Sequence, residues 1–212
     1  NDVQHLIDFV YPDILTAKPT VFADKGILSP TNDSTDEIDG HIQNLLSAET
    51  NIMSTCGNLI KANPDDIAEA TSPELLQSID VTGVPSHHLA LKVCRMVMFV
   101  CNVIFACGIV KGRECVVCAL SPRIVDFKMI ADGMPLVKIP RITFEFKIGR
   151  RGLTFHRQQF QLGVCYAMAI NMSRGQTLER VGLDLRSDVF CDGQLFVALS
   201  RSTSSVNVMC VV

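Results

Sequence analysis

The alternation of hydrophobic and polar blocks along the chain predicts a mixture of strands and helices. Val21–Phe22 and residues 26–28 are typical of a short buried strand, and a Ser-Pro turn follows them. Apolar residues then recur at helical spacing, so residues 32–46 predict an amphipathic helix, and residues 34–37 have the form of a capping box near its start. Three further segments precede residue 89, namely a strand at 51–55, a polar loop at 61–73 and one or two helical turns at 73–79.

Beyond residue 88 the pattern changes to short runs of Val, Cys, Met and Phe between glycines and prolines. These runs predict strands at 89–100, 115–120, 124–130 and 136–146, as in a small β-barrel. A basic turn at 147–152 follows, and strands then alternate with polar segments again. The remaining predicted elements are a strand at 160–169, a polar loop at 171–177, a strand at 181–185, a helix at 192–201 with Asp192 as its N-cap, and a closing strand at 206–212.

The order of these elements predicts one α/β domain that a β-rich segment interrupts, because strands and helices alternate on both sides of that segment. The α/β domain comprises residues 22–88 and 148–212, the inserted barrel comprises 89–147, and residues 1–21 form a lead-in. The 212 residues are 48% hydrophobic and 19% charged, which is enough apolar material for a buried core. A disordered or fibrous protein is therefore excluded.

The apolar runs and the start of the chain indicate where in the cell the protein is expected. The longest apolar-leaning run, Met96–Val110, is interrupted by Asn102 and Gly108 and is shorter than the ~20 residues that a membrane span needs. No basic-then-apolar segment of a secretory signal opens the chain. The chain begins at Asn1 rather than at methionine, as a fragment or a processed piece would. We expect an intracellular protein with no membrane partner.

Charges are divided unevenly along the chain. Residues 1–85 carry 3 basic and 14 acidic side chains, a net charge of −11, whereas residues 86–212 carry 16 basic and 8 acidic side chains, a net charge of +8. This asymmetry is typical of a protein whose C-terminal part binds a polyanion. Two solvated faces that happen to segregate would give the same pattern, so charge alone leaves both interpretations open.

The nine cysteines do not form the pattern of a disulfide framework. Their number is odd and most of them lie inside apolar runs, where cysteine behaves as a small buried hydrophobe in a reducing compartment. Cys115 and Cys118 have the spacing of a metal or redox pair, but no second CxxC or HxxxH accompanies them. The intervening valines predict a strand, which would point the two thiols to opposite faces. We expect structural cysteines and no metal site, with a zinc or redox protein as the alternative.

Two segments carry candidate chemistry. In residues 167–185 a strand runs into a polar loop with a glycine, which lets backbone N–H groups approach a phosphate closely. An ordinary polar loop would show the same pattern. In residues 190–202 an amphipathic helix ends on Arg201, either as a partner of the helix dipole or as an arginine finger toward a nucleotide. The side-chain donors of the first segment are Ser173, Arg174, Gln176 and Thr177.

Taken in order, these segments resemble the PIF-type (petite integration frequency) DNA helicases, including the helicase ends of Helitron transposons. Four blocks carry the resemblance: Gly26–Asp39 resembles the start of the second motor domain, Leu89–Asn102 the start of an inserted barrel, Ala169–Thr177 the TINKSQGQT motif, and Gly193–Arg201 the GQxxVALSR motif. The resemblance implies an α/β fold, namely the RecA-like second motor domain of a superfamily-one helicase with an inserted small β-barrel.

The resemblance also implies roles for particular residues. Arg201 would be the arginine finger on the ATP γ-phosphate, and Gly175 and Gln176 would face the nucleotide. The implied contacts of single-stranded DNA or its coupling path are Thr31, Asn32, Ser173, Arg174, Thr177 and Arg157. ATP and Mg²⁺ would be shared with a first motor domain N-terminal to this chain. The implied protein is a monomer that moves 5′ to 3′ in DNA repair, recombination, telomere maintenance or transposition, and it is nuclear in a eukaryote.

This sequence departs from the family pattern at several positions. The phosphate-binding motif GxxxxGKS/T is absent from the 212 residues. Met172 and Arg174 stand where the family has Lys and Gln, and Cys94 and Met96 stand where it has Gly and Pro. These departures favour a second interpretation, a non-catalytic single-stranded-DNA-binding remnant of a transposon-derived helicase.

We predict that the 212-residue chain alone does not hydrolyse ATP. The missing motif supplies the N–H groups and the Lys that hold the β- and γ-phosphates in such motors. A phosphate-release assay with and without single-stranded DNA should give the same background rate. DNA-stimulated hydrolysis by the pure chain would contradict the prediction.

Overall fold

The computed structural model describes residues 2–46, 51–54, 56–61, 81, 84–85, 87–102, 109–130, 135–148 and 153–212. The chain forms two compact units: the α/β unit, residues 1–48 and 164–212, and the β-rich unit, residues 49–163. These bounds differ from the predicted domain boundaries. The segments 51–54, 56–61 and 153–159 join the β-rich unit because they pair with strands of that unit. The predicted helical turns at 73–79 lie outside the described residues.

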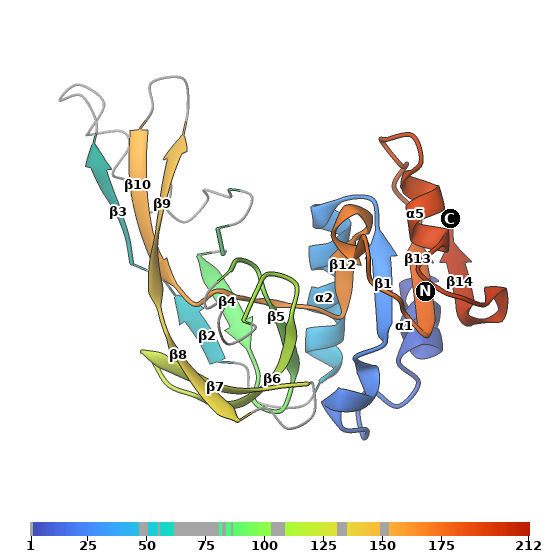
Figure 1. The fold of residues 1–212 in the computed structure, drawn as a ribbon, viewed down its shortest axis with the longest axis horizontal. Coiled ribbons are helices and arrows are strands. Elements are labelled where there is room, and N and C mark those ends of the chain that lie inside the picture. Colours follow the sequence, from blue (N-terminus) through green and yellow to red (C-terminus); the bar gives the residue numbers. More distant parts are fainter. Residues whose placement is uncertain are drawn as a thin grey trace. The chain divides into compact units, whose positions relative to one another are not determined.

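The α/β unit is built on a parallel sheet (Figure 1). Its strands, in the order β12-β1-β13-β14, are Ala167–Ala169, Lys25–Ser29, Arg180–Asp184 and Val208–Val211. Ile27 of β1 lies opposite both Ala167 and Gly182, so β1 is an inner strand of this sheet. The apolar runs at 26–28 and 181–185 are confirmed as strands, whereas β14 begins at Val208 because Ser205–Asn207 form a 3₁₀ turn.

Helices α1 (Asp2–Val10) and α2 (Asn32–Leu45) pack on this sheet. The buried residues of α1 recur at helical spacing and include Leu6 and Val10. A Cβ at Gly182 of β13 would come within 2.9 Å of both of these side chains, so the glycine is what lets α1 approach the strand. Residues that the sequence marked only as a lead-in therefore form part of the core.

Several predicted element ends differ in the α/β unit. Val21 and Phe22 belong to a 3₁₀ turn, Pro19–Phe22, rather than to a strand. The cap of α2 is Thr31, whose hydroxyl accepts from the Ser34 N–H, so the capping box predicted at 34–37 lies one turn too late. Helix α5 covers only Gln194–Leu199, and Gly193 rather than Asp192 is its N-cap.

The β-rich unit contains a five-stranded sheet with the order β11-β5-β6-β7-β8. These strands are Leu162–Val164, Met96–Phe99, Glu114–Leu120, Ile124–Met129 and Leu136–Pro140. Their alternating buried residues form one core that includes Phe99, Val117 and Phe127. Among the described residues, two smaller sheets accompany it: β2 (Asn51–Ser54) with β4 (His88–Leu91), and β3 (Cys56–Lys61), β10 (Leu153–Gln159) and β9 (Ile142–Ile148). Closure into a barrel stays a prediction.

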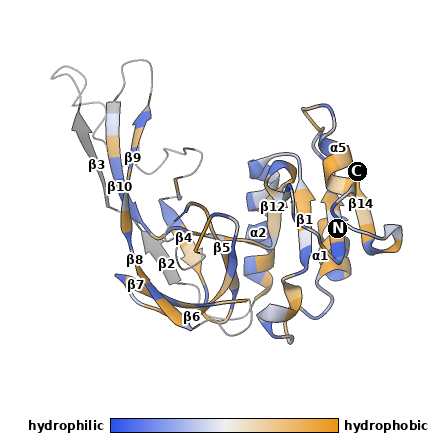
Figure 2. Cartoon of the chain, viewed as in Figure 1, coloured by the Kyte–Doolittle hydropathy of each residue, from blue (hydrophilic) through white to orange (hydrophobic). Residues whose placement is uncertain are grey.

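The strands predicted at 51–55, 115–120 and 124–130 are confirmed, but the longer runs are divided. The run at 89–100 forms β4 and β5, and the run at 136–146 forms β8 and β9, which Arg141 separates. The run predicted as one strand at 160–169 forms β11 and β12. Hydropathy gives the length of such a run but not the position of the turn inside it. In the described strands of this unit, hydrophobic and hydrophilic residues lie side by side (Figure 2).

A left-handed residue divides β4 from β5. Cys94 has a φ of +60°, and its N–H donates to the Val117 carbonyl at 2.7 Å, while the Val117 N–H donates to the Arg95 carbonyl at 3.0 Å. Two residues thus lie opposite one, which is the pattern of a G1 β-bulge, a position that favours glycine. The Cys94 departure from the family glycine therefore falls where a side chain is costly.

We predict that Cys94→Gly raises the free energy of unfolding by about 1 kcal/mol, because a β-carbon is disfavoured by roughly that amount in the left-handed region. Urea denaturation followed by circular dichroism measures the change. Cys118→Gly is the matched control, because Cys118 is exposed within β6 without a positive φ. It should lower stability by about 0.5–1 kcal/mol. A loss of stability in Cys94→Gly would contradict the prediction.

A buried carboxyl group joins α2 to the sheet. The Asp39 side chain is 7% exposed, and its Oδ1 accepts from the Ala167 N–H at 2.8 Å. Burial raises the pKa of Asp39 from 3.8 to about 8, against the opposing effect of these backbone hydrogen bonds. The folded protein consequently binds this proton more tightly than the unfolded chain does, and the stability from this group is lost as the pH rises from about 4 to about 8.

We predict that Asp39→Asn gains stability relative to the parent chain as the pH rises from 5 to 8, since the amide keeps the acceptor and cannot ionise. Both tyrosines of the chain, Tyr11 and Tyr166, lie in the α/β unit, so urea denaturation by tyrosine fluorescence reports on this unit. Asp33→Asn, at an exposed position of the same helix, is the control. A difference between Asp39→Asn and parent that stays constant with pH would contradict the assignment.

Candidate functional site

The carboxyl ends of the parallel strands bring three loops to one edge of the sheet, the carboxyl edge. Pro30–Thr31 follows β1, residues 170–177 follow β12, and residues 185–193 follow β13. Ligands of open α/β sheets bind outside the carboxyl ends of the strands, where the strand order reverses. β1 has β12 on one side and β13 on the other, so the chain changes direction beside it. This edge is the candidate site.

The loop after β12 contains a tight turn, Ser173–Gln176, which we call the motif turn. The Gln176 N–H donates to the Ser173 carbonyl at 3.0 Å. Arg174 has φ −59° and ψ 123°, and Gly175 has φ +86°, which are the angles of a type II turn. Ser173 is buried and its hydroxyl donates to the Ile170 carbonyl at 2.8 Å. Arg174, Gly175 and Thr177 are exposed, so the turn presents its basic side chain to solvent.

Arg201 holds the motif turn from the other side. Its Nη1 donates to the Ser173 carbonyl at 3.2 Å and to the Gln176 carbonyl at 2.9 Å. Its Nε donates to the Val197 carbonyl at 2.9 Å, and its own carbonyl accepts from the Leu178 N–H at 2.9 Å. Arg201 therefore caps the end of α5, as one sequence interpretation expected, and also fastens α5 to the motif turn. The expectation of an arginine finger stays a prediction.

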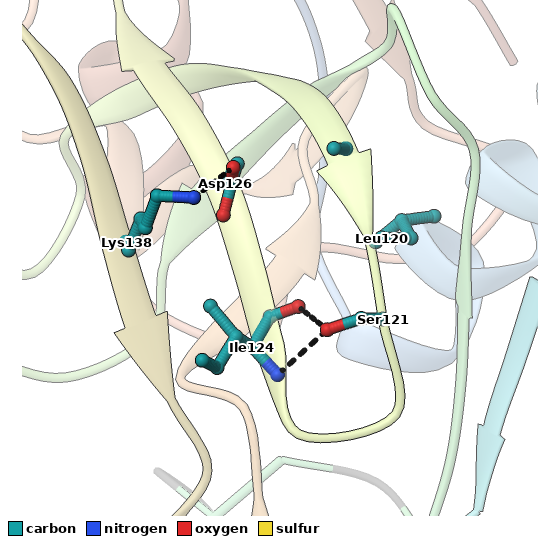
Figure 3. Close-up of a pocket in the computed structure, with 6 residues that line it drawn as sticks. Leu120, Ser121, Ile124, Asp126 and Lys138 are labelled. Carbon is teal, nitrogen blue, oxygen red and sulfur yellow. Dashed lines mark hydrogen bonds and ion pairs between the residues drawn. The ribbon is translucent and has the colours of Figure 1, made fainter.

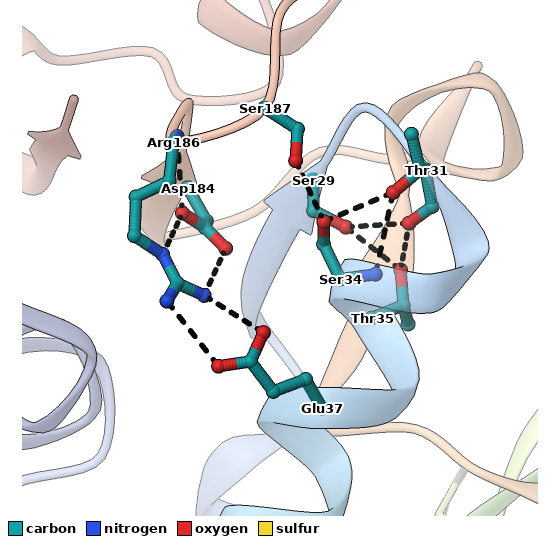
Figure 4. Close-up of polar contacts among 8 residues, drawn as sticks. All are labelled: Ser29, Thr31, Ser34, Thr35, Glu37, Asp184, Arg186 and Ser187. Atoms are coloured by element: carbon teal, nitrogen blue, oxygen red, sulfur yellow. Dashed lines mark hydrogen bonds and ion pairs between the residues drawn. The ribbon is translucent and has the colours of Figure 1, made fainter.

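Thr31 and Asn32 lie at the start of α2, beside a cluster of hydroxyl groups (Figure 4). Thr31 Oγ1 lies 2.9 Å from Ser34 Oγ, and Ser34 Oγ lies 3.2 Å from Ser187 Oγ in the loop after β13. Ser29 and Thr35 join the same cluster. Asn32, the first helical residue, is exposed at the positive end of the α2 dipole.

A charged network fastens the loop after β13 to α2 (Figure 4). Arg186 donates from Nε and Nη2 to the two carboxylate oxygens of Asp184 at 2.8 and 2.9 Å. It also donates from Nη1 to Glu37 Oε1 of α2 at 3.2 Å. Hydrogen bonding to Asp184 raises the pKa of Arg186, so the guanidinium stays charged and holds the loop in place.

Gln194 joins two of the loops at this edge. The side chain is 2% exposed. Its Nε2 donates to the Pro30 carbonyl and its Oε1 accepts from the Phe190 N–H, both at 3.3 Å. The Gln194 amide thereby links Pro30, the residue before the Thr31 cap, to the segment before α5.

Arg157, a predicted DNA contact, lies in the β-rich unit and is 1% exposed. Its Nη1 donates to the Pro85 carbonyl at 3.0 Å, and its guanidinium lies 5.5 Å from the centre of the Phe146 ring. The structure thus gives Arg157 a packing role within the β-rich unit. The DNA contact expected of Arg157 stays a prediction, and it would require the buried guanidinium to become accessible.

Several residues at this edge are not among the site residues that the sequence predicts: Ser29, Thr35, Asp184, Arg186, Ser187 and Gln194. Gln194 lies inside the Gly193–Arg201 motif. The signal that could have marked it is an amide residue that begins an otherwise apolar helix and is buried. Asp184 and Arg186 are two residues apart at the end of a strand, a spacing that brings a carboxylate to a guanidinium when the strand ends between them. The hydroxyl cluster carries no spacing signal, because it joins residues more than 150 positions apart.

Other candidate features lie in the β-rich unit. A hollow of about 240 Å³ is bounded by the β6–β7 hairpin and β8, and its lining includes Ser121, Asp126 and Lys138 (Figure 3). Lys138 Nζ and Asp126 Oδ2 pair at 2.8 Å, which leaves no net charge to attract a ligand. Cys115 is buried and Cys118 is exposed, as the strand interpretation of the CxxC segment expected. In the described part of the chain, no helix is both long and apolar enough to span a membrane.

Comparisons with known proteins show that this chain is similar to DNA helicases. A family model described as the DNA helicase Pif1 2B domain matches residues 74–120. The chain is 36% identical over 142 residues to the ATP-dependent DNA helicase PIF1 of Danio rerio and 34% identical over 141 residues to that of Homo sapiens. Each match covers 63% of this chain and 21% of the relative, so the chain spans about a fifth of the length of these relatives.

Solved structures show the same fold. A Bacteroides Pif1 bound to single-stranded DNA gives a TM-score of 0.64 at 21% identity, over 87% of this chain and 40% of that one. A Bacteroides Pif1 in complex with ADP-AlF3 and single-stranded DNA gives 0.66 at 17% identity, over 99% of this chain and 44% of that one. The chain is thus similar in sequence to the PIF-type DNA helicases, over a part that corresponds to their C-terminal region, and this agrees with the resemblance of the sequence motifs.

We predict that Arg201→Ala lowers the free energy of unfolding of the α/β unit by about 1.5–3 kcal/mol, the range for hydrogen bonds to a charged group. The loss is expected because the guanidinium bonds three backbone carbonyls. Tyrosine-monitored denaturation measures the loss. Arg174→Ala removes an exposed guanidinium and should stay within about 0.5 kcal/mol of the parent. Equal effects of the two substitutions would contradict the account.

Proposed function

We propose that this chain is part of an ATP-dependent DNA helicase, in which the α/β unit acts as the RecA-like second motor domain. Similarity to PIF1 helicases supports the class of activity. The observation that carries the assignment is Arg201 on the motif turn at the carboxyl edge, since two family motifs, distant in sequence, meet there through direct hydrogen bonds.

In the proposed motor, ATP lies between the α/β unit and a first motor domain that supplies the phosphate-binding loop. The motif turn suits an anionic group, because Gly175 has open space around its α-carbon and Arg174 is exposed beside it. We place the Mg²⁺ ligands in the first motor domain, and assign none among the described residues. Bound ATP supplies the free energy of hydrolysis that drives stepping along DNA.

Arg201 is the proposed arginine finger of this motor. Its guanidinium now donates to the neutral carbonyls of Ser173 and Gln176. A phosphate oxygen carries a negative charge and would add an ion pair to the hydrogen bond, so a nucleotide would compete with these carbonyls for the same donors. Single-stranded DNA is the proposed partner of Thr31, Asn32, Arg174 and Thr177, which are solvent-accessible at the carboxyl edge. Ser173 is buried and would act through the turn.

A non-catalytic DNA-binding remnant is the second candidate function, and Met172 favours it. This side chain is 40% exposed beside the motif turn, where the family has a lysine that would contact phosphate. Under this proposal the carboxyl edge binds single-stranded DNA but contributes no step to hydrolysis. Hydrolysis by the chain joined to a first motor domain from a relative would decide between the two.

We predict weak, non-specific binding of single-stranded DNA whose logarithmic affinity falls linearly with log salt concentration. Counterion release gives a slope near −0.7 for each phosphate neutralised. Fluorescence anisotropy with a labelled oligo-dT measures the slope, and Arg174→Ala should make it shallower by about 0.7.

Lys18→Ala is the control for this measurement. It removes one exposed positive charge from the same unit, next to the 3₁₀ turn that precedes β1, and should leave the slope unchanged. An affinity independent of salt, or no binding at low salt, would contradict the proposed partner.

A further inference from the structure

Helix α5 is a short rod whose two ends are tied to different loops of the carboxyl edge. It covers six residues, Gln194–Leu199. Its first residue bonds the loop after β1, and Arg201, just past its last residue, bonds the motif turn. The loop at its first end leads to the proposed DNA contacts Thr31 and Asn32. The loop at its second end carries the proposed nucleotide contacts and also Arg174 and Thr177. All of these contacts lie within the α/β unit.

At the first end, the Gln194 amide makes two hydrogen bonds of opposite sense. Nε2 donates to the Pro30 carbonyl, and Oε1 accepts from the Phe190 N–H. Only a side chain with both a donor and an acceptor can make this pair. Because the amide is buried, breaking either bond leaves an unpartnered polar group, which costs more than the bond itself contributes. Movement of Pro30 therefore carries Gln194 with it.

At the second end, the bonds are equally directional. Arg201 Nε caps Val197 in α5, while Nη1 reaches both carbonyls that define the motif turn. A type II turn has one arrangement of these two carbonyls, so a displacement of α5 along its axis must either move the turn or break these bonds. Helix α5 thus transmits a displacement of the Pro30 backbone to the motif turn, residues 173–176.

We propose that Gln194 is a positioning residue that couples the DNA contacts at Thr31–Asn32 to the motif turn through α5. This inference rests on the proposed function, which assigns DNA to the first loop. Coupling of this kind is reciprocal: if DNA at Thr31 changes the motif turn, a ligand on the motif turn changes DNA affinity by the same factor. Two other ties, Ser34–Ser187 and Glu37–Arg186, join α2 to the loop after β13 but do not reach α5 directly.

The test measures amide hydrogen exchange with and without oligo-dT in the 212-residue chain that carries Arg174→Ala and Thr177→Ala. These two substitutions remove the proposed direct DNA contacts of the motif turn, and this double variant is the parent chain of the comparison. In the parent chain, DNA should slow exchange at residues 32–35 and also change it at residues 174–177 by about fivefold or more, the lower end of typical coupling. Gln194→Glu keeps the acceptor for Phe190 and loses the donor to Pro30. It should retain the effect at 32–35 and lose the effect at 174–177.

Two further variants keep the test decisive. Gln158→Glu adds the same charge at an exposed position of the β-rich unit and should behave as the parent does. Arg201→Lys breaks the second end of the rod, because a single ammonium cannot reach all of these acceptors, and should also uncouple residues 174–177. It supplies the answer if Gln194→Glu does not fold.

The outcomes separate the two proposals. If DNA changes exchange at neither segment of the parent chain, the proposed DNA contact fails. If DNA slows exchange at 32–35 but leaves 174–177 unchanged, the coupling fails and the DNA contact stands. If Gln194→Glu or Arg201→Lys folds and keeps the full effect at 174–177, the coupling does not run through α5.

Discussion

The position of β1 between two parallel neighbours is the constraint on which the candidate site depends. β1 pairs in parallel with β12 through Ile27 and Ala167, and with β13 through Ile27 and Gly182. Parallel pairing sends all three carboxyl ends to one edge, although β1 and β12 are separated by more than 130 residues of chain. The geometry of this edge therefore does not depend on the long β-rich segment between the two strands, because the backbone hydrogen bonds of the sheet determine it.

Side chains then fix the loops that the sheet brings together. Arg186 fastens the loop after β13 to α2, Gln194 fastens the segment before α5 to Pro30, and Arg201 fastens α5 to the motif turn. Each tie ends on a backbone carbonyl or a carboxylate, so each is directional and specific. The two family motifs contact each other directly through Arg201. We therefore treat Arg201 as a structural residue as well as a proposed catalytic one.

Sequence reasoning found the elements whose signal is local and missed those that depend on partners far along the chain. Strand β13 and helix α2 follow from apolar spacing. The role of α1 follows only from its contact with Gly182, and the break at Cys94 only from its bond to Val117. Motif resemblance located Gly175, Gln176 and Arg201 at one edge. It could not show that Arg157 is buried, because the sequence of a strand does not reveal whether a basic side chain points to the core or to solvent.

The carboxyl edge of the α/β unit is the proposed DNA-binding surface of this protein. Nuclear magnetic resonance of the nitrogen-labelled chain, titrated with oligo-dT, tests it most directly. We predict that the backbone amide resonances of Thr31–Thr35, at the start of α2, shift at the lowest DNA concentrations. Shifts confined to the β-rich unit, or to residues at the amino ends of β1 and β13 such as Asp24 and Glu179, would contradict it.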